Sequence, residues 1–257
     1  MKNTGNVVLP AGLPVIVTGA TGGIGKEIVR AIARLRHPMI LPCRNEKKFS
    51  VLAEEIRTEF PGIELSYIPL DLNDSCSVKE AIGKLAGKRL AGVVNNAGIM
   101  CRYYSVSPDG PETTLNVNYF NTMLFNNAIL PQVEQGGGVV FTTSITRKFV
   151  AKDDTADSVD EHTFGQLKTY ALSKKLIADY ALNLADEAGR RGVRVNCCDP
   201  GIVDSGMITM HRWYDPLANI FFRPFIRTAR NGAVPAIRAL LSPHSGHIYT
   251  LRGEHLS

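Results

Sequence analysis

Residues 14–25 read Pro14-Val15-Ile16-Val17-Thr18-Gly19-Ala20-Thr21-Gly22-Gly23-Ile24-Gly25. The first four are apolar and mostly β-branched, which is typical of a buried parallel strand. The residues that follow carry apolar side chains at helical spacing, namely Ile28, Ala31, Ile32 and Leu35. Glycines between a strand and a helix let a pyrophosphate approach the helix N-terminus, where free N–H groups favour negative charge. The stretch therefore predicts a dinucleotide-binding turn, and a glycine-rich turn used only for packing is the alternative.

Beyond this turn, strand-like and helix-like patterns alternate along the whole chain, which is typical of a doubly wound parallel sheet. We expect further strands at 39–41, 63–69, 91–94, 138–142, 193–198 and 247–249, and helices at 45–59, 74–87, 113–132, 164–189 and 231–241. Together these predict an α/β, Rossmann-type sheet of about seven strands with helices on both faces. No linker, repeat or low-complexity tract divides the chain, so we expect one domain over residues 1–257.

The composition is that of an ordinary globular protein, with 44% hydrophobic and 21% charged residues among 257. The net charge of +5 comes from scattered lysines and arginines, without the basic run that a nucleic-acid-binding protein shows. The five cysteines are odd in number and have no C-x-x-C spacing, so they indicate free thiols and no metal site. We find neither a secretory signal nor an apolar stretch of about 18 residues, and we expect a cytoplasmic protein.

Arg44 follows the second strand, at the place where dinucleotide-binding folds read the adenosine ribose. An acidic residue there accepts from the 2′-hydroxyl of NAD, whereas an arginine accommodates the 2′-phosphate of NADP. The residue therefore favours NADP over NAD, and a solvated helix start is the alternative. Asp71, after the third strand, is either an acceptor for the adenine amino group or a cap of the following turn.

Tyr170 and Lys174 form a Y-x-x-x-K pair within the stretch that is expected to be a long helix. Four residues make about one helical turn, so both side chains lie on the same face. An ammonium beside a phenol lowers the phenol pKa from about 10, which produces a general acid or base near neutral pH. Taken alone, the pair is a weak signal, because a surface tyrosine beside a solvated lysine has the same spacing.

Together the motifs resemble those of the short-chain dehydrogenase/reductase family over nearly the full chain. The matches are T-G-x-x-x-G-x-G at 18–25, N-N-A-G at 95–98, a helix asparagine, a strand-end serine, Y-x-x-x-K at 170–174 and P-G at 200–201. Cys43-Arg44-Asn45 and the gap of 26 positions from Ser144 to Tyr170 make the chain most similar to the retinol-dehydrogenase-like, NADP-preferring branch.

The resemblance implies an oxidoreductase that interconverts a carbonyl and an alcohol by hydride transfer. Tyr170 would be the general acid or base, Lys174 would lower its pKa and bind the nicotinamide ribose, and Ser144 would polarise the substrate oxygen. Asn118 would hold a water in a proton relay, with Asn116 as the alternative. The residues implied to contact the cofactor are Gly19, Thr21, Gly23, Ile24, Gly25, Arg44, Asp71, Leu72, Asn95, Ala97, Gly98, Tyr170, Lys174, Pro200, Gly201 and Val203.

The resemblance also implies a substrate lid at about 204–228, and the aromatic residues there predict a hydrophobic carbonyl or alcohol. Lid packing with a subunit contact, or a peripheral membrane contact, are alternatives for the same residues. Family members commonly pair through the long helices, which implies a homodimer or homotetramer. Departures from the family pattern lie beside the substrate end, at Asn121, Phe141, Thr143 and Cys197-Cys198-Asp199. A catalytically silent nucleotide-sensing or scaffold protein is the alternative function, and the four intact catalytic residues argue against it.

Overall fold

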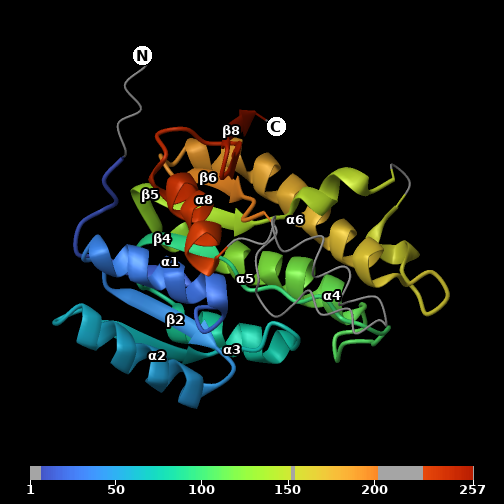
Figure 1. Ribbon diagram of the computed structural model, residues 1–257, viewed down its shortest axis with the longest axis horizontal. Coiled ribbons are helices and arrows are strands. Elements are labelled where there is room, and N and C mark those ends of the chain that lie inside the picture. The colour runs from blue at the N-terminus through green and yellow to red at the C-terminus, as the bar shows by residue number, and fades with distance from the viewer. Residues whose placement is uncertain (1–6, 152–153, 202–227, 257) are drawn as a thin grey trace.

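The computed structural model describes residues 7–151, 154–201 and 228–256. Within them, one sheet has the strand order β3-β2-β1-β4-β5-β6-β7-β8 (Figure 1). The strands are β1 (Val15–Val17), β2 (Met39–Cys43), β3 (Leu65–Pro69), β4 (Leu90–Asn95), β5 (Val133–Thr142), β6 (Arg194–Cys198), β7 (His247–Thr250) and β8 (Gly253–Leu256). The pairings from β3 across to β7 are parallel, and β8 is antiparallel to β7. The predicted doubly wound sheet is confirmed.

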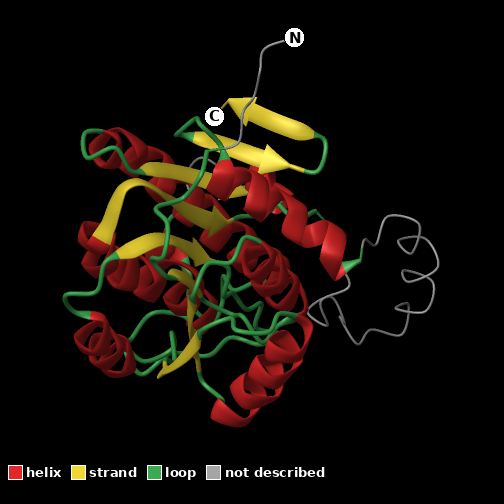
Figure 2. Ribbon diagram, turned by 90° about the vertical axis from the view of Figure 1, so that its left-hand side faces the viewer, coloured by secondary structure: helices red, strands yellow, loops and turns green. Residues whose placement is uncertain are grey.

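Helices cover both faces of the sheet (Figure 2). They are α1 (Gly23–Arg34), α2 (Glu46–Glu59), α3 (Ser75–Leu85), α4 (Thr113–Leu115), α5 (Asn121–Ile129), α6 (Gln166–Gly189) and α8 (Ala229–Leu241). A π-helical turn, η1 (Asn116–Phe120), joins α4 to α5, and short 3₁₀ turns occur at η2 (Leu130–Gln132), η3 (Ile145–Phe149) and η4 (Ala156–Ser158). None of the described helices is long and apolar enough to cross a bilayer.

The two faces of the sheet bury two separate hydrophobic clusters. One cluster contains apolar residues of α1, α2 and α8, and the other contains those of α3, α5 and α6. Strand β1 feeds both, because successive side chains of a strand point to opposite faces: Ile16 belongs to the second cluster, and Val15 and Val17 to the first. Burial on both faces explains why this strand is a continuous apolar run.

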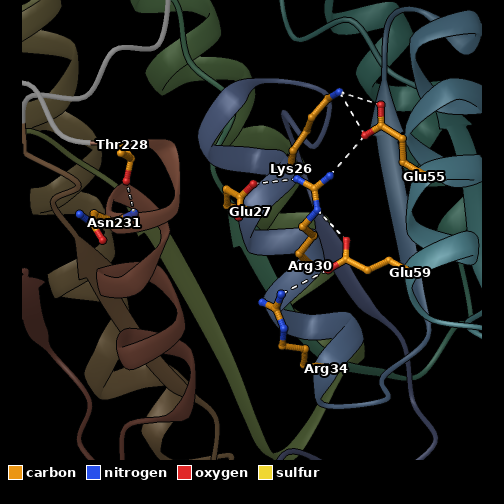
Figure 3. A network of polar contacts seen from close by, with 8 residues as sticks. All are labelled: Lys26, Glu27, Arg30, Arg34, Glu55, Glu59, Thr228 and Asn231. Carbon is orange, nitrogen blue, oxygen red and sulfur yellow. Dashed lines mark hydrogen bonds and ion pairs between the residues drawn. The ribbon is translucent and has the colours of Figure 1, made fainter.

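Helix α2 is joined to α1 by ion pairs (Figure 3). Arg30 of α1 lies 2.9 Å from Glu59 through Nε, and 2.7 Å from Glu27 of its own helix. Partly exposed pairs of this kind contribute about 0–1 kcal/mol each. Burial of Leu52 and Ile56 contributes about 1.5–3 kcal/mol per side chain, so apolar packing dominates the docking of α2.

Three features differ from the sequence predictions. The sheet has an eighth strand, β8, where only a final strand at 247–249 was expected. Strand β5 begins at Val133 and is therefore longer than the predicted 138–142. Its pairing with β4 contains a register shift between Leu90 and Gly92. The helix predicted at 113–132 is interrupted by the π-turn, where Asn116 and Asn121 contact neighbouring loops, and it ends in a 3₁₀ turn that contains Pro131.

The strand order reverses direction between β1 and β4, since β1 leads outward to β2 and β3 while β4 leads to β5, β6 and β7. Ligands of open parallel sheets bind at such a switch point, outside the carboxyl ends of the strands. Most of the predicted site residues follow those strand ends directly.

Candidate active site

The glycine turn after β1 has the backbone shape that the sequence predicts. Gly19 has φ +65°, and a side-chain Cβ there would lie 2.8 Å from the Ala97 Cα. A Cβ on Gly25 would lie 2.1 Å from the Gly19 carbonyl oxygen, so neither position admits a larger residue without a shift. Helix α1 begins at Gly23 without a side-chain cap, which leaves its first N–H groups for a ligand.

Thr18 connects this turn to the end of β4. Its hydroxyl accepts hydrogen bonds from the backbone N–H groups of Asn96 and Ala97, each at 3.1 Å. Asn96 in turn donates from Nδ2 to the carbonyls of Thr18 and Gly19. The predicted residues Ala97 and Gly98 are thereby held beside the glycine turn. Asn95 is buried, and its Oδ1 has no hydrogen-bond partner in the described structure.

Arg44 and Asp71 follow β2 and β3, which are neighbouring strands. Arg44 is exposed, and Asn45 beside it caps α2 by accepting from the Lys48 N–H at 2.9 Å. Asp71 Oδ1 accepts from the Asn73 N–H at 2.9 Å, so the turn-capping role considered from the sequence is present. The carboxylate of Asp71 has a second oxygen, so the cap leaves an acceptor for an adenine.

Asn118 sits inside the π-turn and contacts two other parts of the site. Its side chain exchanges hydrogen bonds with the Ile99 backbone, accepting at 2.8 Å and donating at 2.8 Å. Nδ2 also donates to the Ser173 hydroxyl of α6 at 3.0 Å. Asn116, the alternative, instead donates to the Asn73 carbonyl and to Asp109. The geometry therefore favours Asn118 over Asn116, since of these two side chains it is Asn118 that hydrogen-bonds to the helix that carries Tyr170 and Lys174.

Lys174 and Tyr170 lie together at the start of α6. Lys174 Nζ lies 5.7 Å from the centroid of the Tyr170 ring and donates to the Thr142 carbonyl at 2.9 Å. Ser144, after β5, lies near enough to the Tyr170 hydroxyl to lower its pKa. A Cβ on Gly98 would lie 3.0 Å from Lys174 Nζ and 3.2 Å from Asn118 Oδ1. The four predicted catalytic residues are thus brought together by β4, β5, η1 and α6.

The protonation behaviour of the pair differs from the sequence prediction. Burial and the Asp199 carboxylate raise the pKa of Tyr170 to about 12, and the contact with Ser144 only partly opposes this. Burial lowers the pKa of Lys174 to about 8, against the opposing effect of Cys198, Asp199 and Cys197. The phenol pKa therefore lies above its ordinary value in the protein alone, where a value lowered by Lys174 was expected, because burial and Asp199 disfavour the phenolate.

An ion pair beside this cluster was not anticipated from the sequence. Arg147 Nη1 lies 3.4 Å from Asp199 Oδ2, and the side chains are only 14% and 6% exposed. Asp199 stood out as a departure before Pro200-Gly201, but nothing local indicated its partner 52 positions away. Thr143, another departure, donates from its hydroxyl to the Lys174 carbonyl at 2.8 Å. Pairing of β5 with β6 brings these residues together.

Pro200 and Gly201 directly follow β6, as predicted, and the Gly201 N–H donates to Asp199 Oδ1 at 2.9 Å. Val203 lies outside the described residues, as does the predicted lid up to residue 227.

The family model for short chain dehydrogenases matches residues 14–213. The chain belongs to this family. This dehydrogenase is 32% identical to human retinol dehydrogenase 12 over 252 residues, which are 95% of the chain and 79% of the relative. It is 31% identical to mouse polyprenol dehydrogenase over 248 residues, covering 92% and 74% of the two chains. The resemblance to the retinol-dehydrogenase-like branch is confirmed.

Solved structures of the family share the fold of this dehydrogenase. A short chain dehydrogenase from Shigella flexneri in complex with NADP superposes with a TM-score of 0.70 at 23% identity, covering 96% of this chain and all of that one. One from Escherichia coli superposes with a TM-score of 0.69 at 24% identity, covering 95% and 97% of the two chains.

The glycine turn fits a dinucleotide. Two glycines that admit no Cβ without a shift and, among the described residues, a helix start without a side-chain cap lie at the switch point of the sheet. Family membership and this turn together support binding of a nicotinamide dinucleotide.

Proposed function

We propose that this dehydrogenase interconverts a carbonyl and an alcohol on a hydrophobic substrate, with NADPH as the preferred cofactor and Tyr170 as the general acid. The observation that carries the proposal is the cluster of Tyr170, Ser144 and Lys174, with Asn118 reaching the same helix through Ser173. Four polar groups of the types that the chemistry requires converge beside the glycine turn.

In the reductive direction, a nicotinamide nucleotide held at the glycine turn would supply the hydride for the carbonyl carbon. The Ser144 hydroxyl donates a hydrogen bond to the carbonyl oxygen and stabilises the charge that develops there. The Tyr170 hydroxyl gives its proton to that oxygen, and its raised pKa keeps it protonated at neutral pH. Lys174 is anchored on the Thr142 carbonyl and holds a positive charge near the phenol below pH 8 or so.

The NADP preference rests on Arg44. Arg44 is exposed at the end of β2, whereas Arg30 and Arg34 of the adjacent helix are engaged in ion pairs with Glu55 and Glu59 (Figure 3). No carboxylate follows β2 before Glu46, and Arg44 forms no ion pair among the described residues, so its guanidinium is available to a 2′-phosphate.

The apolar substrate is supported by the turn that follows Ser144. Ile145 and Phe149 of η3 are 46% and 81% exposed, although apolar side chains of this size are usually buried. The relatives named for retinol and polyprenol are named for hydrophobic alcohols. We also propose a homo-oligomer, because members of this family commonly associate through their long helices. We propose a cytoplasmic location, because the odd number of cysteines indicates free thiols.

The test is the substitution Tyr170→Phe, assayed with retinaldehyde and aliphatic aldehydes as substrates. We expect kcat for reduction to fall about 10²–10⁴-fold, because the general acid is removed, while NADPH binding changes little. Tyr180→Phe on the same helix is the matched control, since its hydroxyl contacts Asn126 and Asn127. Unchanged turnover in Tyr170→Phe would remove Tyr170 from the mechanism.

A further inference from the structure

Two loops that carry different parts of the site meet at the ion pair of Arg147 and Asp199. Arg147 belongs to η3, three residues after Ser144, and Asp199 follows β6 directly before Pro200. Arg147 Nη1 lies 3.4 Å from Asp199 Oδ2 and donates to the Ser144 carbonyl at 3.0 Å. One guanidinium nitrogen therefore contacts both the serine loop and the loop that lines the predicted nicotinamide site.

Asp199 is fixed from three sides. Its Oδ1 accepts from the Gly201 N–H at 2.9 Å, its Oδ2 faces Arg147, and its own N–H donates to the Tyr249 carbonyl of β7 at 2.8 Å. The side chain is only 6% exposed. A carboxylate so far removed from water requires a charged partner, and among the described residues Arg147 is the cation with which it forms an ion pair.

The charges that surround this pair belong to the site itself. Asp199 acts on the pKa of both Tyr170 and Lys174, raising each, and the buried thiols Cys197 and Cys198 also raise the pKa of Lys174. Arg147 pairs with the Asp199 carboxylate and so partly neutralises the negative charge that acts on Tyr170 and Lys174.

We propose that Arg147 and Asp199 are a positioning pair for the reaction: they hold the Ser144 hydroxyl at a fixed place relative to Pro200-Gly201 and balance the charge beside Tyr170. The inference rests on the proposed function, because it assigns these residues to the same site. Neither side chain is assigned a contact with substrate or cofactor, so both act through Ser144 and Tyr170.

The experiment is a four-protein cycle of wild type, Arg147→Gln, Asp199→Asn and the double variant. Each single change should lower kcat about tenfold to a hundredfold through misplacement of Ser144, and the double variant should be no worse than the poorer single one. The pH midpoint of alcohol oxidation should fall in Asp199→Asn and rise in Arg147→Gln, because the two changes remove opposite charges. Arg147→Lys, which keeps the charge, should restore the midpoint toward that of wild type.

Glu134→Gln is the matched control. Arg89 and Glu134 form an ion pair at 2.7 Å at the N-terminal ends of β4 and β5, far from the candidate site at the carboxyl ends. Glu134→Gln should leave kcat and the pH midpoint unchanged. Equal midpoints in all members of the cycle, or fully multiplicative losses in the double variant, would overturn the proposal.

Hydrogen exchange measured by mass spectrometry separates this proposal from the proposed function. Exchange across residues 143–149 should be faster in Asp199→Asn than in wild type and unchanged in Glu134→Gln. If wild type reduces no carbonyl but this difference is present, the proposed function fails while the pair still positions the Ser144 loop. If exchange does not differ, the positioning pair is overturned whatever the activity.

Discussion

At the scale of single residues, the site combines groups whose pKa values are moved by burial in opposite directions. The pKa of Tyr170 is raised to about 12 and that of Lys174 is lowered to about 8. Desolvation disfavours the charged form of each group, so the phenol stays neutral and the lysine loses its charge at a lower pH than usual. The protein alone is therefore prepared to donate a proton rather than to accept one.

This arrangement predicts different pH profiles for the two directions. Reduction should be nearly constant from pH 6 to about 8 and then decline, because Lys174 loses its charge above its lowered pKa. Oxidation needs the phenolate of Tyr170, so its rate should rise with pH across the same range and beyond. Measurement of kcat/KM in both directions between pH 5.5 and 10 checks this. An oxidation rate that falls from pH 7 to 10 would contradict it.

Arg44 supports a second prediction, on cofactor choice. Arg44→Ala should raise the Kd for NADPH about tenfold to a hundredfold, which corresponds to the loss of one charge-assisted hydrogen bond of about 1.5–3 kcal/mol. The Kd for NADH should change little, because NADH has no 2′-phosphate. Titration of each nucleotide by its fluorescence gives both values. Lys88→Ala is the control: it also removes one positive charge, before β4 at the other end of the strands, and should change neither Kd. Equal weakening of NADPH and NADH binding in Arg44→Ala would show that Arg44 does not contact the 2′-phosphate.

At the scale of elements, the asparagines of the segment 113–132 explain its irregular shape. Asn116 and Asn121 each donate to Asp109 Oδ2, at 2.9 and 2.8 Å, and also to the carbonyls of Asn73 and Leu72. Five residues separate them, which is about 140° apart on a regular α-helix. The π-turn, closed by the Asn121 N–H to the Asn116 carbonyl, brings both to one carboxylate. The loop after β3 is thereby tied to the turn that holds Asn118.

The contribution of the Asp109 carboxylate to stability can be tested by lowering the pH. Burial by itself would raise the pKa of Asp109, but hydrogen bonds from Ser75, Asn116 and Asn121 outweigh it and lower the pKa to about 2. A carboxyl with a lowered folded-state pKa adds stability above its ordinary pKa, and that stability disappears as pH falls from about 4 to about 2. Asp109→Asn should therefore be less stable than wild type at pH 7, and the difference should close over this window.

Urea unfolding at pH 7, 4, 3 and 2 measures the difference. Asp186→Asn, a substitution of an exposed carboxylate on α6, is the control. A difference between Asp109→Asn and wild type that is equal at every pH would argue against the carboxylate and for packing alone.

Local sequence predicted the elements that repeat an apolar pattern and missed those set by contacts elsewhere. β1, with Val15, Ile16 and Val17, is buried on both faces and was found from its residues alone. β8 lacks β-branched residues, and it pairs because a turn at Thr250–Gly253 folds it back onto β7. Asparagines are poor helix formers, but the partners of Asn116 and Asn121, namely Asp109, Asn73 and Leu72, lie in loops that only the folded chain brings near.

At the scale of the whole molecule, the order of motifs along the chain predicted which segments meet at the candidate site. Parallel strands bring their carboxyl ends to one edge of the sheet, so residues after β1, β4, β5 and β6 had to meet there. The pair of Arg147 and Asp199 and the high pKa of Tyr170 could not be predicted in this way, because both depend on distances and burial rather than on order.

Binding of the preferred nucleotide should stabilise the entire fold. NADPH at about 100 times its Kd adds about 2.7 kcal/mol, which raises the Tm of a domain of this size by about 5–10 °C. NADH at the same concentration should give a clearly smaller rise if Arg44 selects NADP. Differential scanning fluorimetry of the protein with each nucleotide checks this. Equal increases in Tm with NADPH and NADH would show that the protein does not prefer NADPH.

The π-turn also affects how this chain is compared with others. Such a turn holds one residue more than an α-helical turn, so a relative with a regular helix here aligns correctly only with a one-residue gap inside that helix. Without that gap, either the residues before Asn116 or those after Asn121 are shifted by one position relative to such a relative. Residue equivalence for Asn118 is therefore best taken from superposed coordinates, with 113–115 and 121–129 fitted separately.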